Sequence, residues 1–460
     1  MLSLDCHHPD LLDFIHAKSD LDKVTKANIS VRVTDDFMQA VEANEDFELS
    51  FSRAETGEVI TKTVKAREVF CELAKMNWDY AEPGVLFWDR IKDWSLLSNN
   101  DEFEYAGTNP CAEEPLPAGG SCLLGSINLS EFVIYPFKKN ASFDFDGFRN
   151  AVKICVRALN DVLDEGLPLH PLQEQRDSVR DWRQIGLGVM GIADMLIKLG
   201  LRYGSEEAIN LCSIIGSLMA ETAIDCSCDL AQQYGQYPKC SSTGVILSPF
   251  FQENSGWAED IAERALIHGL RNSQLLTIAP TGTLSTMLGV SGGIELIFAT
   301  SYTRKTVSLH NKKGEVYYTV YTPVIAQLMA AKGIAAEADL PDYVVTAQEL
   351  DYKERIEMQS VWQKHIDASI SSTVNVPHEQ LSKSGVCPSF QYKRGKGETL
   401  CDGKSCASAI GNVLRSIIRG TKMEELGQEK DKAKKHSLCP SCGEPLIYEG
   451  GCNVCRSCGW

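Results

Sequence analysis

The residues best suited to catalysis lie in one stretch, Gly107–Ser130, with the sequence GTNPCAEEPLPAGGSCLLGSINLS. Asn109, Cys111 and Glu113 occupy alternate positions, and Cys122 follows a turn rich in proline and glycine. Alternate side chains of an extended chain point the same way, so an amide, a thiol and a carboxylate are expected to converge. Residue types alone also allow a surface loop with a structural cysteine, because buried cysteines are common and inert.

A second stretch, residues 274–298, has the composition of a phosphate-binding turn. Its apolar residues 275–279 predict a short buried strand of the kind found in α/β proteins. The strand leads into a turn whose hydroxyl and backbone N–H groups suit a diphosphate, formed by Pro280, Thr281, Gly282, Thr283 and Ser285. Turns of the Pro-Thr-Gly type also occur without a ligand, so that alternative stays open.

Cysteines near the end of the chain have the spacing of a metal or redox site. Two CxxCG motifs and one additional cysteine supply Cys439, Cys442, Cys455, Cys458 and Cys452. This spacing suits tetrahedral zinc in a ribbon, but a CxxC pair is also a redox dithiol, and the additional cysteine keeps both interpretations open.

At the other end of the sequence, Cys6, His7 and His8 are adjacent residues. Adjacent side chains point apart, so the start of a helix is favoured there over a metal site.

The elements that must position these groups follow from periodicity. Ile29, Val31 and Val33 alternate as in a strand, and Thr34 is a good start for the helix that follows. Residues 44–66 predict a surface hairpin, whereas apolar residues at helical spacing predict helices over residues 152–163 and about 205–234.

A glycine motif between these two helices resembles a nucleotide-binding turn. Gly186, Gly188 and Gly191 in IGLGVMG match GxGxxG, but the preceding DSVRDWRQ is too polar for the buried strand that a dinucleotide-binding turn requires. We expect close helix packing at these small residues instead.

Composition excludes several classes of function. The 460 residues include 45 Lys and Arg against 62 Asp and Glu, a formal charge of −17. This balance argues against binding to duplex DNA or to an anionic membrane, whereas free nucleotides need only a few local donors. The sequence has no apolar run of about 18 residues and no signal peptide, so we expect a cytoplasmic protein.

Three stretches in the same order resemble the large subunit of ribonucleotide reductases, most closely the adenosylcobalamin-dependent class II enzymes. They are Asn109–Leu129, Ala279–Arg304 and His365–Pro377. The resemblance implies part of a ten-stranded α/β barrel over residues 1–380, threaded by a central finger loop. An irregular segment and charged linker would follow over 381–438, then the cysteine-rich tail over 439–460.

The resemblance also implies roles for individual residues. Cys111 would become a thiyl radical that removes the ribose 3′ hydrogen, and Glu113 would take the proton of the 3′-hydroxyl group. Asn109 would hydrogen-bond the same region, and Cys122 would be one of two thiols that reduce the 2′ position. Residues 280–285 would hold the substrate phosphates, and adenosylcobalamin would be the radical source.

Partners follow from the same resemblance. The loop over residues 18–28 would lie between a nucleotide effector and the substrate base, and its candidate residues are Lys18, Lys23, Lys26 and Asn28. A plain solvated loop is the alternative. A dimer and a thioredoxin-like reductant are further expectations. The cysteine-rich tail of such enzymes often carries the dithiol that reduces the active-site disulfide.

Two departures from the family pattern qualify these expectations. The chain begins where the barrel should already be under way, so we expect the partner thiol of Cys122 on an N-terminal reductase chain. After Pro377 the sequence lacks the expected helix and barrel strand.

Two other interpretations stay open. A class I large subunit with a separate radical-generating subunit is disfavoured because no Tyr-Tyr pair follows the barrel; Tyr317 and Tyr318 lie in a predicted hairpin. The other is an inactive remnant whose zinc ribbon binds protein.

Overall fold

The computed structural model describes residues 1–373, except 21, 255, 258 and 308–314, together with two short strands near the end of the chain. These strands, β14 (Ile447–Glu449) and β15 (Cys452–Val454), pair in antiparallel orientation. Cys439, Cys442, Cys455 and Cys458 lie outside the described residues, as does the segment 381–438. Of the predicted tail cysteines, Cys452 alone has a described backbone position.

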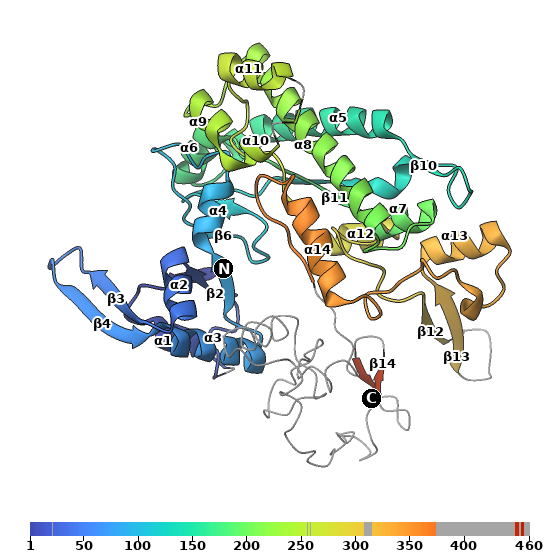
Figure 1. Ribbon diagram of the computed structural model, residues 1–460, viewed down its shortest axis with the longest axis horizontal. Helices are drawn as coiled ribbons and strands as arrows, with labels where there is room; N and C mark the ends of the chain where they lie inside the picture. Colours follow the sequence, from blue (N-terminus) through green and yellow to red (C-terminus); the bar gives the residue numbers. More distant parts are fainter. Residues whose placement is uncertain are drawn as a thin grey trace.

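A parallel sheet of three strands forms the first structural unit, with the order β1-β2-β5. Its strands are β1 (Leu2–Asp5), β2 (Ile29–Val33) and β5 (Gly84–Phe87). The packed helices are α1 (Leu11–Ile15), α2 (Asp35–Ala43) and α3 (Ala66–Tyr80). A hairpin of β3 (Asp46–Ser52) and β4 (Val59–Lys65) extends from this unit (Figure 1). The predicted strand over 29–33, the helix after Thr34 and the hairpin are confirmed.

A second group of strands lies at the centre of the main hydrophobic core. Strands β8 (Leu124–Asn128) and β11 (Gly186–Met190) pair in parallel. Isolated parallel bridges extend the group from Leu187 to Leu276 and from Ile278 to Ile370. All of β11 is buried.

The expectation of helix packing at the glycine motif is therefore wrong, because Gly186 and Gly188 lie inside strand β11. Their lack of a side chain allows close strand contact: a Cβ atom on Gly188 would lie 2.2 Å from the carbonyl oxygen of Thr277. The motif thus serves packing between strands.

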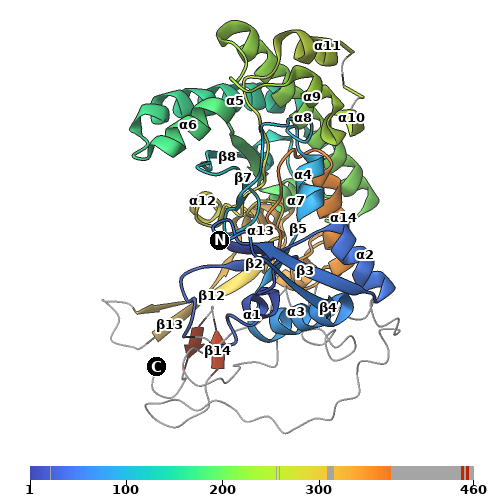
Figure 2. The ribbon, with the colours of Figure 1, turned by 90° about the vertical axis from the view of Figure 1, so that its left-hand side faces the viewer.

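Helices cover this second group of strands and occupy the upper part of Figure 2. The long helix α8 (Glu206–Tyr234) packs against α5 (Phe145–Gly166), and the helices predicted over 152–163 and 205–234 are thereby confirmed. Among the described residues, α8 is the one helix long and apolar enough to cross a membrane, but 67% of its apolar window is buried inside the protein. The apolar surface of α8 is therefore buried mainly in the hydrophobic core.

The remaining elements are short helices and hairpin strands. The helices are α4 (Trp88–Trp94), α6 (Gln173–Trp182), α7 (Ile192–Leu199), α9 (Ser242–Leu247), α10 (Pro249–Glu253), α11 (Glu259–His268), α12 (Gly282–Leu288), α13 (Pro323–Lys332) and α14 (Tyr352–Gln363). Single 3-10 turns cover Leu129–Phe132, Leu167–Leu169 and Glu337–Asp339. The strands are β6 (Gly107–Thr108), β7 (Pro115–Leu116), β9 (Val133–Ile134), β10 (Ser142–Phe143), β12 (Ser301–Val307) and β13 (Glu315–Tyr321).

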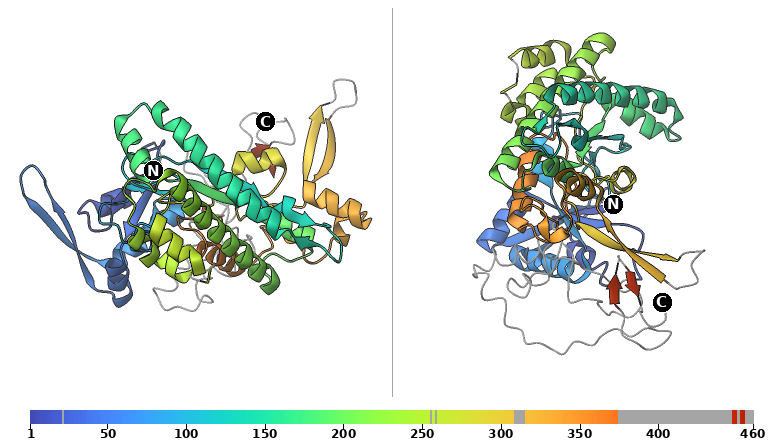
Figure 3. Two further views of the ribbon diagram at one scale, coloured as in Figure 1. Left: turned by 90° about the horizontal axis from the view of Figure 1, so that it is seen from above. Right: turned by 90° about the vertical axis from the view of Figure 1, so that its right-hand side faces the viewer.

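Tyr317 and Tyr318 lie in the hairpin of β12 and β13, as predicted. This hairpin and that of β3 and β4 project at opposite ends of the molecule (Figure 3). Within the described ranges, the parallel strands form two groups and do not close into one continuous sheet.

Candidate active site

The stretch with the catalytic residue types forms a small hairpin. Strands β6 and β7 pair in antiparallel orientation, and residues 109–114 form the tip. Asn109 organises the tip, since its Oδ1 atom accepts a hydrogen bond of 3.1 Å from the backbone N–H of Glu114. The backbone N–H of Ala112 donates to the carbonyl oxygen of Asn109 at 3.0 Å, and Ala112 has a φ of +64°. The extended geometry expected for this segment is therefore wrong.

The tip places its thiol and carboxyl groups in different environments. Cys111 is exposed, whereas Glu113 is buried, with 2% of its surface exposed. The Oε2 atom of Glu113 has no hydrogen-bond partner among the described residues. A buried polar atom of this kind normally has a partner, so its orphaned state marks a place where a ligand group can bind.

Contacts with distant segments hold Glu113 in place. Its backbone carbonyl oxygen accepts a hydrogen bond of 2.6 Å from the hydroxyl group of Thr277. The same carbonyl oxygen accepts one of 3.1 Å from the backbone N–H of Ser369. The finger hairpin is thereby attached to the second group of strands, close to the bridge between Ile278 and Ile370.

Glu113 is also the common electrostatic neighbour of the two candidate thiols. Partial burial, and then the charge of Glu113, raise the pKa of the Cys111 thiol. Partial burial followed by the charges of Glu114 and Glu113 raises the pKa of Cys122 to about 12, although the surface of Cys122 remains open to solvent. Both groups therefore keep their S–H hydrogen at neutral pH. This suits hydrogen-atom chemistry better than nucleophilic chemistry, which needs a thiolate.

The predicted phosphate turn begins helix α12. Thr281 adopts a left-handed conformation with φ of +49°, and its hydroxyl oxygen accepts a hydrogen bond of 3.0 Å from the backbone N–H of Gly293. Ser285 is buried and donates from its hydroxyl group to the carbonyl oxygen of Gly282 at 3.3 Å. The residues of the turn that are open to solvent are Pro280, Gly282 and Thr283. Thr283 and the N–H groups of the first helical turn are thus the parts available to a phosphate.

The loop over residues 18–28 connects to both the first sheet and the finger. Lys18 forms an ion pair with Glu82, whose other oxygen accepts a hydrogen bond of 3.2 Å from the backbone N–H of Ile29. Lys23 forms an ion pair with the exposed Asp20, at 3.4 Å. The remaining candidates, Lys26 and Asn28, are exposed. Lys18 is therefore a structural anchor, whereas the other three side chains are open to solvent.

A chain of contacts joins the end of this loop to the base of the finger. The carbonyl oxygen of Asn28 accepts a hydrogen bond of 2.8 Å from the backbone N–H of Leu2. The neighbouring Met1 sulfur accepts one of 3.3 Å from the hydroxyl group of Thr108, which belongs to β6. The loop and the finger hairpin thus meet at the N-terminal end of β1.

Sequence reasoning missed a buried polar group beside the candidate thiols. Glu114 accepts a hydrogen bond of 2.5 Å from Gln274, and the Oε1 atom of Gln274 accepts one of 3.2 Å from Gln184. Nearby, Asp367 accepts hydrogen bonds from the backbone N–H groups of Leu275 and Leu276, and burial raises its pKa to about 7. The one available signal was the second glutamate of the sequence CAEEP.

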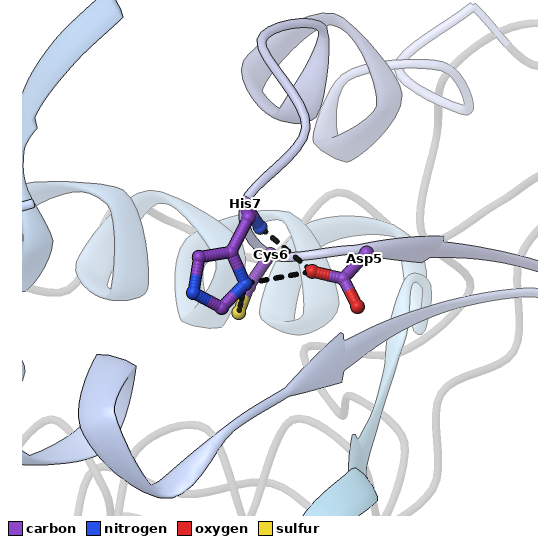
Figure 4. Close-up of side chains that lie close together, drawn as sticks. All are labelled: Asp5, Cys6 and His7. Atoms are coloured by element: carbon purple, nitrogen blue, oxygen red, sulfur yellow. Dashed lines mark hydrogen bonds and ion pairs between the residues drawn. The ribbon is translucent and has the colours of Figure 1, made fainter. Parts of the chain in front are cut away.

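A separate cluster of metal-binding residue types lies at the C-terminal end of β1. Figure 4 shows Asp5, Cys6 and His7, whose ligand atoms lie within 4.8 Å of one another. The Nδ1 atom of His7 lies 2.8 Å from Asp5, and its Nε2 atom lies 3.2 Å from Asp36. The two ring nitrogens of His7 each contact a carboxylate, one on β1 and one on α2, so His7 joins these two elements.

Comparison with known proteins identifies the family. A family model described as the barrel domain of ribonucleotide reductase matches residues 1–389. This chain belongs to that family. The resemblance inferred from the three sequence stretches is thereby confirmed, and the family description supports the α/β barrel class of fold.

Three relatives of the ribonucleotide reductase family illustrate the similarity. The vitamin B12-dependent ribonucleoside-diphosphate reductase of Thermoplasma acidophilum is 33% identical over 470 residues, which cover 98% of this chain and 57% of the relative. The enzyme of the same name from Mycobacterium tuberculosis H37Rv is 32% identical, with 82% of this chain and 51% of the relative covered. The ribonucleoside-diphosphate reductase subunit alpha of Chlamydia trachomatis is 26% identical, with 88% and 41% covered. The chain spans about half the length of these relatives.

Proposed function

We propose that this chain is the catalytic barrel part of a vitamin B12-dependent ribonucleotide reductase, which converts ribonucleotides into 2′-deoxyribonucleotides for DNA synthesis. The observation that carries the proposal is the finger hairpin, in which the buried carboxyl group of Glu113 acts on two protonated thiols, Cys111 and Cys122. A site for hydrogen-atom transfer needs thiols that keep their hydrogen, and these thiols do so.

In the proposed reaction, the Cys111 sulfur radical takes the hydrogen atom from the 3′ carbon of the ribose, which leaves a carbon radical. Glu113 accepts the 3′-hydroxyl proton through its unpartnered oxygen, as expected of a general base. The 2′-hydroxyl group leaves as water after it receives a proton from a thiol. Cys122 and a second thiol supply two electrons and become a disulfide. Cys111 then returns its hydrogen atom to the 3′ carbon, which restores the sulfur radical, and Glu113 returns the proton to the 3′ oxygen.

Asn109 has a divided role in this proposal. Its Oδ1 atom accepts a hydrogen bond from the backbone N–H of Glu114, so its Nδ2 group is the part that would donate to a substrate oxygen.

The turn at residues 280–285 would hold the substrate phosphates through Thr283 and the first N–H groups of α12. The loop over residues 18–28 would sense the nucleotide effector, with Lys23, Lys26 and Asn28 as its exposed side chains.

Adenosylcobalamin is the cofactor that belongs to this proposal. When bound, it supplies the radical that removes the hydrogen atom from a thiol. The residues present fit such a group, because the Cys111 thiol is exposed and can be reached by a large molecule. The neighbouring Ala112 packs against the apolar cluster of Leu86, Trp88 and Tyr105, which fixes the finger tip beside this cluster.

Other parts of the proposal concern segments beyond the finger. An N-terminal reductase segment or chain would supply the effector site. It would also supply the second thiol, which pairs with Cys122. The tail cysteines would hold zinc or pass electrons from a thioredoxin-like dithiol to the site. A ten-stranded closed barrel, a dimer and a cytoplasmic location complete the proposed arrangement.

The proposal is tested by anaerobic turnover of the chain combined with an N-terminal reductase segment, adenosylcobalamin, a ribonucleoside diphosphate and a dithiol. We expect deoxyribonucleotide to form, and Cys111→Ser to abolish it. The control Cys71→Ser changes a half-buried cysteine on α3 outside the site and should keep the activity.

Three results would contradict the proposal. Turnover that needs a separate radical-generating subunit in place of adenosylcobalamin would favour the class I interpretation. No turnover with either radical source would favour an inactive remnant. Equal turnover in native protein and Cys111→Ser would remove the finger hairpin from the mechanism.

A further inference from the structure

The turn after β1 brings together three side chains of metal-binding types. Strand β1 ends at Asp5, and the backbone N–H of His8 donates to the carbonyl oxygen of Asp5 at 3.1 Å, which folds Cys6 and His7 into a turn. The Nδ1 atom of His7 lies 3.6 Å from the Cys6 sulfur and 2.8 Å from the Asp5 Oδ1 atom (Figure 4). The expectation that Cys6 and His7 point apart is therefore wrong.

The distance between sulfur and nitrogen suits joint binding of one zinc ion. Tetrahedral zinc, with bonds of about 2.3 Å to sulfur and about 2.0 Å to nitrogen, holds two such ligands about 3.6 Å apart. Cys6 and His7 already have this separation. The Asp5 oxygen would have to move back by about half an ångström, because an oxygen and a nitrogen on zinc lie about 3.3 Å apart. The Asp5 side chain is 37% exposed, so it has room for this movement.

The other ring nitrogen of His7 has the partner that a zinc-binding histidine needs. Metal-binding histidines nearly always donate their second N–H to a carboxylate, a carbonyl oxygen or water. The Nε2 atom of His7 lies 3.2 Å from Asp36, which in turn accepts a hydrogen bond from the hydroxyl group of Thr34. The ring also packs against Phe47 of β3, with 4.9 Å between the ring centroids. These contacts from α2 and β3 fix the ring with its Nδ1 atom beside the other two ligand atoms.

The charges around the turn favour a cation. Asp5 and Asp36 pair with His7, and in the described part of the chain neither forms an ion pair with a lysine or arginine. The turn lies at the carboxyl end of a parallel sheet, where ligands of open α/β sheets usually bind. A thiol and an imidazole select zinc over magnesium or calcium, which prefer oxygen ligands.

We propose that Asp5, Cys6 and His7 bind one zinc ion, with Asp36 orienting His7 and with a fourth coordination position open to water. Burial raises the pKa of the Cys6 thiol to about 11, so the metal-free protein keeps the S–H hydrogen. The bound ion displaces this proton and the hydrogen between His7 and Asp5. In the metal-free protein the same groups keep the hydrogen bonds described above. The site lies at the end of β1 remote from the finger, and the inference does not depend on the proposed function.

Titration with cobalt(II) tests the site, because cobalt occupies tetrahedral zinc sites and a thiolate–cobalt bond absorbs in the near ultraviolet. The protein is the full chain with its tail cysteines replaced by serine, which removes a competing metal site. These cysteines are Cys439, Cys442, Cys452, Cys455 and Cys458. We expect this background protein to bind about one cobalt ion per chain, to show the thiolate absorption band, and to lose that band when zinc is added.

Single substitutions in this background assign the ligands. Cys6→Ser should abolish the thiolate absorption band, and His7→Gln should weaken zinc binding by at least about tenfold. Asp36→Asn changes only the partner of the ring and should weaken zinc binding about 10- to 100-fold, the usual effect of losing such a partner. The matched control is Asp35→Asn, which removes the neighbouring carboxyl group. That group pairs with Arg90 at 3.2 Å, so its loss should leave zinc affinity unchanged.

Several results would overturn the inference. Cobalt binding without the thiolate band in the background protein would do so before any single substitution is made. A band that persists in Cys6→Ser would place the metal elsewhere, and equal weakening by Asp35→Asn and Asp36→Asn would show binding by general negative charge. If Cys6→Ser does not fold, His7→Gln decides, because its side chain is 37% exposed; unchanged zinc affinity in that variant would overturn the site.

Discussion

The hydroxyl group of Thr277 controls how firmly the finger hairpin is attached, and its removal is a direct test of the site. The hydroxyl proton is shared between the carbonyl oxygens of Glu113, at 2.6 Å, and Ser369, at 2.9 Å. Thr277 is buried, so Thr277→Val keeps the shape of the side chain but leaves two buried acceptors with one fewer donor. Each carbonyl keeps a backbone N–H donor, so the loss costs about 1 kcal/mol, the net contribution of a typical hydrogen bond.

A cost of about 1 kcal/mol corresponds to an increase of roughly fivefold in the open population of the hairpin. Hydrogen exchange followed by mass spectrometry should therefore be roughly fivefold faster in a peptide covering residues 107–116. The matched control is Thr61→Val, which removes an exposed hydroxyl group from β4 and should leave that peptide unchanged. Exchange at the native rate in Thr277→Val would refute the conclusion that this hydrogen bond attaches the finger.

Three other predictions concern packing, pH and metal. Gly188→Ala places a methyl group against a backbone carbonyl and should lower the free energy of unfolding by about 3 kcal/mol in chemical denaturation, whereas Gly166→Ala, which has open space around it, should stay within about 1 kcal/mol of the native value. Partial burial opposes the charge of His7, but hydrogen bonds to Asp5 and Asp36 raise its pKa overall. The protonated His7 should thus stabilise the folded protein fully below its ordinary pKa of 6.5, and this stabilisation should be lost as the pH rises through the raised pKa. In a plot of the unfolding midpoint against pH, His7→Gln should remove this pH-dependent loss. A zinc ribbon in the tail predicts about one zinc per chain by elemental analysis and none after Cys439→Ser, whereas a purely redox tail predicts no zinc in either protein.

The elements that could be predicted are those specified by local pattern. The alternation from Ile29 to Val33 gave β2, and a continuous apolar stripe gave α8, because both elements bury one periodic set of side chains. Strand β11 was misassigned because its glycine-rich sequence has no period of its own. It is a strand because β8 pairs with it and because the backbone at Thr277 approaches it closely.

The details of the site depended on contacts that no local pattern reveals. Alternation predicted that Cys111 and Glu113 point the same way from an extended chain, but the turn between them has a positive φ at Ala112, a conformation that is uncommon for alanine. Burial of Glu113 depends on Thr277, 164 residues further along the chain. Glu114 looked like an ordinary charged residue, and only the folded structure shows that it is buried, with one oxygen in the space left by Gly186.

The charges at the finger distinguish two kinds of cysteine chemistry. A nucleophilic or metal-binding cysteine gains from a nearby cation, which lowers its pKa and favours the thiolate. Cys111 and Cys122 instead face the carboxyl groups of Glu113 and Glu114, and both pKa values are raised. A thiolate has no hydrogen to give, so this environment is poor for nucleophilic attack and well suited to thiols that donate a hydrogen atom or a proton. The acidic surroundings of Cys111 therefore favour the proposed hydrogen-atom role of this thiol over a nucleophilic or metal-binding role.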